Sequence, residues 1–497
     1  MKRLFLTFSI LVFCSACNIA PKYQRPVAFP SPVFPTNFKE MAGSDQWKTA
    51  TPSDEMLRGN WWEMFGDAEL NRLETLINVD NQNVKLAEAQ FRQARAAVDL
   101  QHAGFFPSIG TTPAITETQG SASTATGRLT TAFALPASAS WEVDLFGRIR
   151  TAVEGATANA QSFAASLENV RLSLQSTLAA DYFTLAATDM QLALLDDTIA
   201  AYQRYLQLTV NRFNGGVAAR SDIALAQTQL STAQAQRTDL LTTRTQFEHA
   251  IAVLAGMPPA NLSIATKTIP APPPEIPTAV PSQLLERRPD IAANERLVAV
   301  QNANIGLAKI AYYPLVTLSA SAGLQGNNVQ DIFEWPARFW SIGPSLNQTL
   351  FDFGRRFAAL QQSEAAYDAA VATYRQSVLT AFEDVEDNLA ALRVLAQEAA
   401  EQAQAVAAAE DSLNLITERY KAGTNSYLDV ITTQTIALND ERAAVTILQR
   451  RMIAAVNLVK ALGGGWDRST IPSYDQLRST GMADPVNTEN VAQPLNR

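Results

Sequence analysis

The sequence predicts a mainly α-helical chain that carries a pair of β-hairpins and is built from two tandem copies of one unit. Three observations predict this fold class: motifs that recur at one constant offset, long stretches without proline, and regions of alternating polar and apolar residues. The 497 residues, 47% of them hydrophobic, are ample for a large core. The net charge of −9 comes without a basic patch, so no nucleic acid is expected as a partner.

The internal repeat is the strongest of these signals, because every pair of matching motifs lies 207 positions apart. The matches are Phe105-Phe106-Pro107 with Tyr312-Tyr313-Pro314, Phe146-Gly147-Arg148 with Phe353-Gly354-Arg355, Gly216 with Gly423, Asp222 with Asp429, and Gly256 with Gly463. Chance would not keep one offset over such a length. We therefore expect two repeats, at 67–258 and 282–465, separated by a Pro-rich linker at 259–281 and flanked by segments 17–66 and 466–497.

Each repeat is predicted to hold a helix, two strands, a very long helix and a last helix. The predicted helices are 67–103, 148–213, 221–254, 282–311, 355–420 and 427–462, and the predicted strands are 107–118, 129–145, 314–325 and 337–352. The long helices fall in proline-free stretches, and proline inside a helix costs ~3 kcal/mol. A helix of about 65 residues is roughly 100 Å long, which no globular core needs. An isolated coiled-coil stalk is the alternative.

The predicted helices carry charged residues every few positions, and none contains about 20 consecutive apolar residues, so they are not expected to cross a membrane. The predicted strands alternate instead. In 129–145, apolar residues such as Phe133, Leu135 and Trp141 share one face, as Trp340 and Ile342 do in the second repeat. This period fits a strand with lipid on one side and water on the other, although a soluble sandwich also alternates.

Four strands cannot close a barrel, and open strand edges are not tolerated in lipid. We therefore expect the chain to oligomerise in multiples of four strands. The strand pattern alone leaves the number of subunits open.

The N-terminus is typical of a bacterial secretion signal at 1–16: Lys2 and Arg3 precede a short apolar run, which ends at Cys14-Ser15-Ala16-Cys17. The small residues before Cys17 resemble a lipobox, which implies cleavage after Ala16 and N-acyl and diacylglycerol lipid on Cys17. The alternative is an ordinary signal peptide with an incidental cysteine. Asn18 favours the outer membrane over retention at the inner one.

Signals for catalysis or metal binding are weak. The chain has two histidines, His102 and His249, without metal-ligand spacing, and no phosphate-binding loop. The charge run at Glu383, Asp384, Glu386 and Asp387 is predicted to be a solvated helix face. We expect a non-enzyme with no metal and no cofactor apart from the lipid.

These residues together resemble the TolC/OprM-like outer-membrane efflux family, in its lipoprotein (NodT-type) branch. The resemblance rests on the two repeats, on Cys17 followed by Pro21 and Tyr23, and on the tip segments 212–222 and 419–430. It implies a homotrimer in which four strands per chain build a 12-stranded outer-membrane β-barrel, continued by a long periplasmic α-helical barrel. Residues 36–66, 259–281 and 466–497 would form an equatorial region.

The family also implies a function and partners. The chain would be the outer-membrane channel of a tripartite efflux system, exporting drugs or other small molecules from the periplasm with a periplasmic adaptor (membrane fusion protein) and an inner-membrane pump. The exit duct of a type I protein secretion system is an alternative with the same fold. A lipid-anchored coiled-coil spacer without a pore is an alternative of another class.

The two predicted tips hold the candidate site residues. The resemblance implies that adaptor-docking positions are Arg212, Gly216, Val217, Ser221, Gly423, Thr424, Ser426 and Leu428. It implies a periplasmic gate at Asp222, Tyr420 and Asp429, with Asn425 where the family has an arginine and Arg419 as a neighbouring substitute. Acidic rings of Asp222 and Asp429 would favour cations. Capping of the returning helices is an equally supported role for both aspartates.

Overall fold

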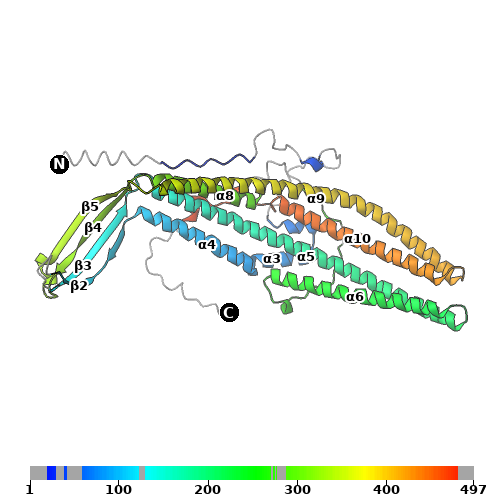
Figure 1. Ribbon diagram of the computed structural model, residues 1–497. Helices are drawn as coiled ribbons and strands as arrows, with labels where there is room; N and C mark the ends of the chain where they lie inside the picture. Colours follow the sequence, from blue (N-terminus) through cyan, green and yellow to red (C-terminus); the bar gives the residue numbers. More distant parts are fainter. Residues whose placement is uncertain are drawn as a thin grey trace.

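The computed structural model describes residues 19–28, 38–41, 59–121, 129–269, 272–274, 276 and 287–478. The molecule is elongated, with a small sheet slanting away from one end of a layer of long helices (Figure 1). The predicted signal peptide and Cys17 lie outside the described residues.

The α-helices of the described residues are α3 (Ala68–Asp80), α4 (Gln82–His102), α5 (Arg148–Asn214), α6 (Arg220–Leu254), α8 (Pro289–Ile310), α9 (Arg355–Lys421), α10 (Tyr427–Ala461) and the short α11 (Tyr474–Leu477). The helices α5 and α9 have 67 residues each, which corresponds to roughly 100 Å. The short helices α4 and α6 both pack on α5, and α8 and α10 both pack on α9, so two short helices flank each long one (Figure 1).

The predicted opening helix 67–103 is interrupted at Asn81, which is a correction to the sequence analysis. Asn81 has an extended backbone, and its side-chain oxygen accepts hydrogen bonds from the amides of Asn83 and Val84 as the N-cap of α4. Its amide nitrogen donates to the carbonyl of Leu254 at 2.7 Å. The break therefore ties α3 and α4 to the end of α6. In the second repeat α8 begins at Pro289 rather than at 282, and 281–286 lie outside the described residues.

The sheet is antiparallel throughout, with β1 (Ser108–Thr111) and β2 (Ala114–Gln119) both paired to β3 (Leu129–Glu142), then β4 (Leu315–Gly326) and β5 (Arg338–Asn347). Since β1 and β2 share one neighbour, they occupy one edge position of a four-position sheet. The predicted strand 107–118 is thus split. The pairing with β3 is interrupted between Thr111 and Ala114, where Pro113 lies on the edge strand and Pro136 lies on β3. Neither proline can donate a backbone hydrogen bond.

The strand β5 ends at Asn347, earlier than the predicted 352. Its ladder ends there because Asn347 pairs with Leu315, the first residue of β4, and the chain then passes through the left-handed region at Phe353 (φ 52°) and Gly354 (φ 86°) before α9 starts. The second repeat therefore reaches its long helix through a tight turn.

The strand register collects the apolar side chains on one face of the sheet. Leu135 lies opposite Leu324, Trp141 opposite Leu318, and Ala320 opposite Ile342. The other face carries serines in register, with Ser138 beside Ser321 and Ser321 beside Ser341. Trp340 and Ile342 on the apolar face are 78% and 64% exposed in the single chain. The apolar face is therefore not covered by any other part of this protomer that the structure describes.

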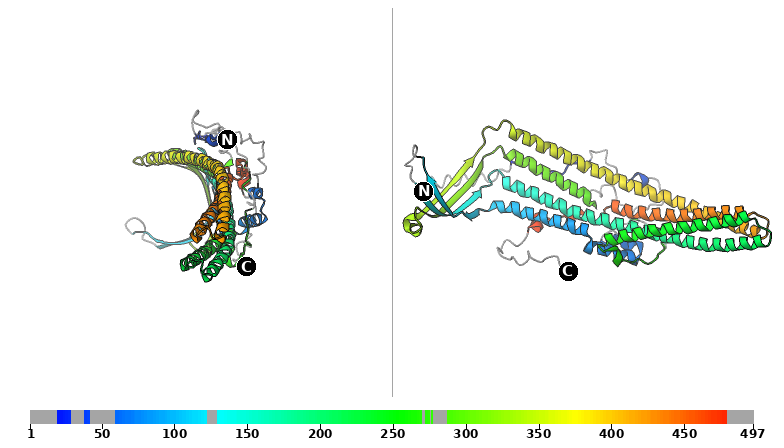
Figure 2. Two further views of the ribbon diagram at one scale, coloured as in Figure 1. Left: turned by 90° about the vertical axis from the view of Figure 1, so that its right-hand side faces the viewer. Right: turned by 60° about the horizontal axis from the view of Figure 1, so that its bottom comes forward.

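The largest hydrophobic core lies about midway along the helices, where α3, α5, α9 and α10 pack against the segment Trp61–Phe65 (Figure 2). It includes Trp61, Leu70, Ile77 and Tyr182, all nearly inaccessible to solvent. Among the described residues, no helix is both long enough and apolar enough to cross a bilayer.

Glu74 is an anomaly in this region, because its side chain is fully buried and neither carboxylate oxygen has a hydrogen-bond partner in the described part of the chain. Burial raises the pKa of Glu74 well above its ordinary value. The folded protein therefore holds this carboxyl uncharged at pH values where the unfolded chain releases the proton.

We predict that Glu74→Gln raises thermal stability at neutral pH. With a raised folded pKa, the wild-type contribution is intact below the ordinary glutamate pKa and is lost as the pH rises towards the folded value. The gain from glutamine should accordingly be largest near neutrality and shrink towards about pH 4. Melting temperatures measured across this range check it. Glu69→Gln on the same helix, where Glu69 pairs with Arg72 near the surface, is the control and should show no such trend. Parallel pH curves for both variants would contradict the prediction.

Candidate functional site: the helical hairpin tips

Two antiparallel helix pairs, α5 with α6 and α9 with α10, reverse direction at the end of the molecule that lies furthest from the sheet (Figures 1 and 2). Residues 215–219 form the first turn and residues 422–426 form the second. These turns are the tips that the sequence predicted.

A glycine in the left-handed conformation ends each long helix. Gly216 has φ 77° and Gly423 has φ 81°. Behind each, the amide of the next residue donates back to the helix, from Val217 to the Arg212 carbonyl at 2.9 Å and from Thr424 to the Arg419 carbonyl at 3.0 Å. This is the Schellman pattern, and it satisfies carbonyls that the helix end leaves open. Nothing lies within 4 Å of a Cβ built on Gly216, so backbone conformation rather than space selects glycine there.

Asp429 belongs to a complete capping box at the second tip. The Ser426 hydroxyl accepts from the Asp429 amide at 3.3 Å, while the Asp429 carboxylate accepts from the Ser426 amide at 3.1 Å. The Asn425 amide group also donates to Asp429, at 3.3 Å. These hydrogen bonds, from Ser426 first and also from Asn425, lower the pKa of Asp429.

The first tip has only half of this box. Asp222 accepts from the Ala219 amide at 3.3 Å, and Ala219 has no side-chain oxygen to return the bond. Both aspartates are thus held by their own turns, in the capping role. A gating role for Asp222 and Asp429 stays a prediction.

Tyr420 joins the two hairpins. Its side chain is 3% exposed and its ring centre lies 5.5 Å from that of Tyr427 on α10. From α5, the Arg212 guanidinium lies 4.5 Å above the Tyr420 ring and donates to the Tyr420 carbonyl, and the Thr209 hydroxyl lies 3.4 Å from the Tyr420 hydroxyl. The sequence assigned Arg212 to docking and Tyr420 to the gate, and the structure brings these two residues into contact.

The other predicted site residues stay apart. Arg419 points to solvent, while Asn425 bonds within its own tip. Val217 and Leu428 are exposed apolar side chains near the two turns. The remaining positions in the prediction, Ser221 and Thr424, are exposed and bond only locally. The tips therefore present polar side chains around two apolar ones.

Sequence reasoning missed a second polar contact between the hairpins, the 3.0 Å hydrogen bond between the hydroxyls of Tyr205 and Thr417. It also missed the apolar cluster beneath it, which includes Val430 and Ala226. Their only signal was the 3–4 residue spacing of α10 and α6, which also marks ordinary core positions.

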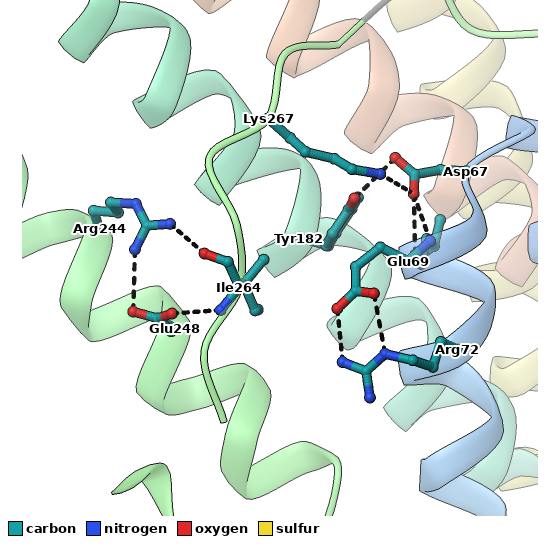
Figure 3. Close-up of polar contacts among 9 residues, drawn as sticks. Asp67, Glu69, Arg72, Tyr182, Arg244, Glu248, Ile264 and Lys267 are labelled. Atoms are coloured by element: carbon teal, nitrogen blue, oxygen red, sulfur yellow. Dashed lines mark hydrogen bonds and ion pairs between the residues drawn. The ribbon is translucent and has the colours of Figure 1, made fainter. Parts of the chain in front are cut away.

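The roots of the hairpins are fixed by a polar network about midway along the helices (Figure 3). The Asp67 carboxylate accepts from Tyr182 on α5 and from Lys267 of the linker, both at 2.8 Å, and caps α3. Although burial raises the pKa of Asp67, the hydrogen bonds from Lys267 and Tyr182 outweigh it, and the net pKa is lowered. The carboxylate is therefore charged at neutral pH.

A second set of bonds holds the linker against α6. Arg244 on α6 donates to the buried Asp189 of α5 at 2.6 Å. Arg244 also donates to the Ile264 carbonyl at 2.7 Å, while Glu248 accepts from the Ile264 amide at 2.7 Å (Figure 3). The amide of Lys267 donates to Asp189 as well, at 3.1 Å. The linker residues from Ile264 to Lys267 thus lock α5 to α6.

The acidic run on α9 is not simply a solvated face, which corrects the sequence analysis. Asp384 pairs with Arg288 at 3.0 Å, and Glu386 accepts from the amide of Lys39 at 2.6 Å. These carboxylates tie the start of α8 and an N-terminal segment to α9. The pairing residues lie far away in the sequence, so helical periodicity could not reveal them.

Comparison with known proteins decides the family. The model of the outer membrane efflux protein family matches residues 76–257 and 280–464, which is most of the two repeats. The chain belongs to the outer membrane efflux protein family. The family predicted from the sequence is thereby confirmed.

Curated members of the outer membrane efflux protein family match over nearly their whole length. A probable efflux pump outer membrane protein, TtgC of Pseudomonas putida, is 28% identical over 483 residues, covering 95% of this chain and 97% of the relative. Outer membrane protein OprJ of Pseudomonas aeruginosa is 29% identical over 470 residues, covering 92% and 95%.

Solved structures agree with the fold. The outer-membrane channel OprN superposes with a TM-score of 0.83 at 27% identity, covering 90% of this chain and 100% of that one. The CmeC outer membrane channel of Campylobacter jejuni, at 21% identity, superposes with a TM-score of 0.85 over 92% of this chain and 97% of that one. The fold class predicted from the sequence is that of these outer-membrane channels.

We predict that Tyr420→Ala loosens the contact between the two hairpins, because removal of a buried aromatic side chain costs about 3–5 kcal/mol in a well-packed core. Tyr420→Phe should behave nearly as wild type, since it keeps the ring and loses only the 3.4 Å hydroxyl contact. Amide hydrogen exchange at residues 205–230 and 412–435 measures the effect. Equal protection of the tips in the alanine and phenylalanine variants would show that Tyr420 does not join them.

Proposed function

We propose that this chain is the outer-membrane channel subunit of a tripartite efflux system that exports drugs or other small molecules from the periplasm to the exterior. The observation that carries the proposal is a four-position sheet with one exposed apolar face, fused directly to helix pairs roughly 100 Å long. A membrane-facing sheet and a long rod in one chain suit a duct that crosses one membrane and extends towards another. A non-enzymatic role is part of this proposal.

The proposed assembly is a homotrimer. In one chain β1 with β2 forms one sheet edge and β5 forms the other, and unpaired edges are not tolerated in lipid. Joining the β5 edge of one copy to the β1–β2 edge of the next closes the sheet, and three copies give a 12-stranded barrel wide enough for a water-filled bore. The helices then continue the barrel as an α-helical tube.

The proposed partners are a periplasmic adaptor and an inner-membrane pump, with the adaptor docked at the tips. Support comes from Val217 and Leu428, which are exposed apolar side chains at the turns, and from the contact between Arg212 and Tyr420 that joins the two hairpins there. Asn425 stands at the family's arginine position, so closure of the gate would rest on Tyr420 and its contacts rather than on a charged latch. The aspartates Asp222 and Asp429 would line the entrance.

We further propose that lipid on Cys17 anchors the chain in the outer membrane. The first described residues lie along α8: the Asn302 side chain donates to the Pro21 carbonyl at 2.9 Å, and Ala20 contacts Gly306. Gly306 is close to the end of α8, where the chain passes into the sheet at Leu315. A lipid attached three residues before Ala20 would therefore lie near the membrane end of the molecule.

Tyr23 fastens this N-terminal segment by donating to Glu295, a fully buried carboxylate that also pairs with Arg296 and with Arg468. Burial raises the pKa of Glu295, yet the bonds from Arg296 and Tyr23 leave it lowered. The charged carboxylate thus holds segments from near both ends of the chain.

Conductance and phenotype test the channel function. The purified protein should give discrete conductance steps in a planar bilayer, and deletion of its gene should increase drug sensitivity while secreted proteins stay at normal levels. Loss of one secreted protein without drug sensitivity would favour the alternative of a type I secretion exit. Absence of conductance from the intact oligomer would favour the pore-free spacer and overturn the proposal.

The lipid anchor has its own test. Cys17→Ser should abolish incorporation of labelled palmitate, because the mature chain would have no other cysteine to acylate. Cys14→Ser lies within the predicted signal peptide and is the control, which should still be labelled. Labelling of the Cys17→Ser protein would rule out acylation at this residue.

A further inference from the structure

A pocket of about 780 Å³ lies against α5 about midway along the molecule, away from both the tips and the sheet. Residues of α5 between Glu168 and Gln175 line one side of it. The other walls come from the segment 59–62, from Asn78 on α3 and from the loop 463–470 that follows α10. The segment 59–65 and the chain after α10 lie on the convex side of the curved helix layer (Figure 2). The pocket is therefore on the outer face of the proposed duct.

The lining of this pocket combines aromatic and polar side chains. Trp62 and Trp466 supply the aromatic surface. Glu168 and Arg171 pair with each other at 2.8 Å, so they add little net charge. Amide and hydroxyl groups make up most of the remaining polar lining, at Asn60, Asn78, Gln175, Ser469 and Thr470. Such a lining is complementary to an uncharged ligand that has an apolar face and many hydrogen-bonding groups.

The second repeat shows that these polar side chains are not required by the fold. The positions 207 residues after Arg171 and Gln175 are Val378 and Phe382 on α9. Val378 is buried in an apolar cluster, and Phe382 packs against that cluster. One long helix thus uses apolar side chains where the other uses polar ones. The polar side chains of α5 are accordingly a feature of the pocket rather than of helix packing.

A run of glycines gives the pocket a wall of bare backbone. The helix α6 ends at one left-handed glycine, Gly256, whereas α10 is followed by Gly463, Gly464 and Gly465, all with positive φ. A Cβ built on Gly464 would lie 2.3 Å from a methyl carbon of Leu172. The loop can approach α5 this closely because it has no side chain there. Two of the three glycines therefore exceed what ending a helix requires, and they shape the pocket.

We propose that this pocket binds the glycan of the bacterial cell wall, a chain of β-linked, N-acetylated amino sugars. The apolar face of a sugar ring packs on a tryptophan ring, and its hydroxyl and N-acetyl groups bond to amide and carboxylate side chains. The inference rests on the proposed duct and goes beyond it by assigning a partner to the outer face.

The place of the pocket supports a cell-wall partner. A duct that runs from the outer membrane towards the inner one has to pass through the cell wall. Arg171 and Gln175 lie roughly 35–40 Å along α5 from its start at Arg148, which is the end next to the sheet. The pocket is thus below the membrane and on the side of the duct that the wall surrounds.

Binding of a soluble fragment tests the site. The purified full-length protein should bind a β-linked tetramer of N-acetylglucosamine in a calorimeter, and should bind the matching glucose tetramer more weakly. Asn78→Ala should weaken binding about tenfold, which is the loss of about one hydrogen bond. Trp466→Ala should abolish it. The controls are Asn83→Ala on α4 and Trp335→Ala, both exposed and outside the pocket, which should bind as wild type does.

Co-sedimentation with purified cell-wall sacculi extends the test to the intact partner. The wild-type protein should sediment with the sacculi, and the N-acetylglucosamine tetramer should release it. Asn78→Ala and Trp466→Ala should both reduce the sedimented fraction. Undiminished sedimentation of both variants would mean that another surface holds the wall, and would overturn the assignment of this pocket. Equal binding of the glucose tetramer would overturn recognition of the N-acetyl group.

Conductance of the same preparations in a planar bilayer separates this inference from the proposed channel. Conducting protein that binds neither the tetramer nor the sacculi overturns the glycan site and leaves the channel in place. Protein that binds the glycan at this pocket but never conducts overturns the channel and supports the site.

Discussion

The structure depends on one constraint, that a helix of 67 residues is too long for any single neighbouring helix to cover. A rod this long offers an apolar stripe that no single neighbour can cover, so two shorter helices stack end to end against each flank. The helix α5 has such cover on both sides, from α4 with α6 and from α8 with α10. Within the described part of the chain, α9 has such cover on one side only, from α8 with α10. A curved, open layer of helices results (Figure 2).

The helices are held together more firmly in the middle of this layer than at its tips. Around its middle, the half-buried Asp67 and the buried Asp189 and Glu295 are each bonded to two or more partners from distant segments. Breaking one partner of such a buried network leaves an uncompensated charge, which opposes rearrangement there. At the tips, the Arg212–Tyr420 contact, a few hydroxyl contacts and a small apolar cluster join the hairpins, and none of these buries an ion pair. Movement of the tips is therefore less costly than movement of their roots.

Local features were predictable because their causes are local. The bounds of α5, α6, α9 and α10 fall within one residue of the positions read from periodicity and from glycine stops. Where a predicted boundary was wrong, a partner distant in the sequence or a restriction on the backbone determined where the helix or strand ends. Asn81 ends α3 because its side chain caps α4 and bonds to Leu254. At the candidate site, the capping residues Ser426 and Asp429 are three positions apart, so the capping pattern can be recognised in the sequence. The Arg212–Tyr420 contact joins residues 208 positions apart, and no local pattern predicts it.

The sequence by itself determined that there are two equivalent repeats, which segments are long helices, and which strand residues share a face. These properties follow from periodicity and from the conformational limits of proline and glycine, which act over a few residues. Only the tertiary structure decided how the repeats join, because the same helix sequence pattern is buried at Leu172 and exposed at Leu379. Burial is a property of the neighbour as much as of the residue, and no local pattern records which neighbour is present.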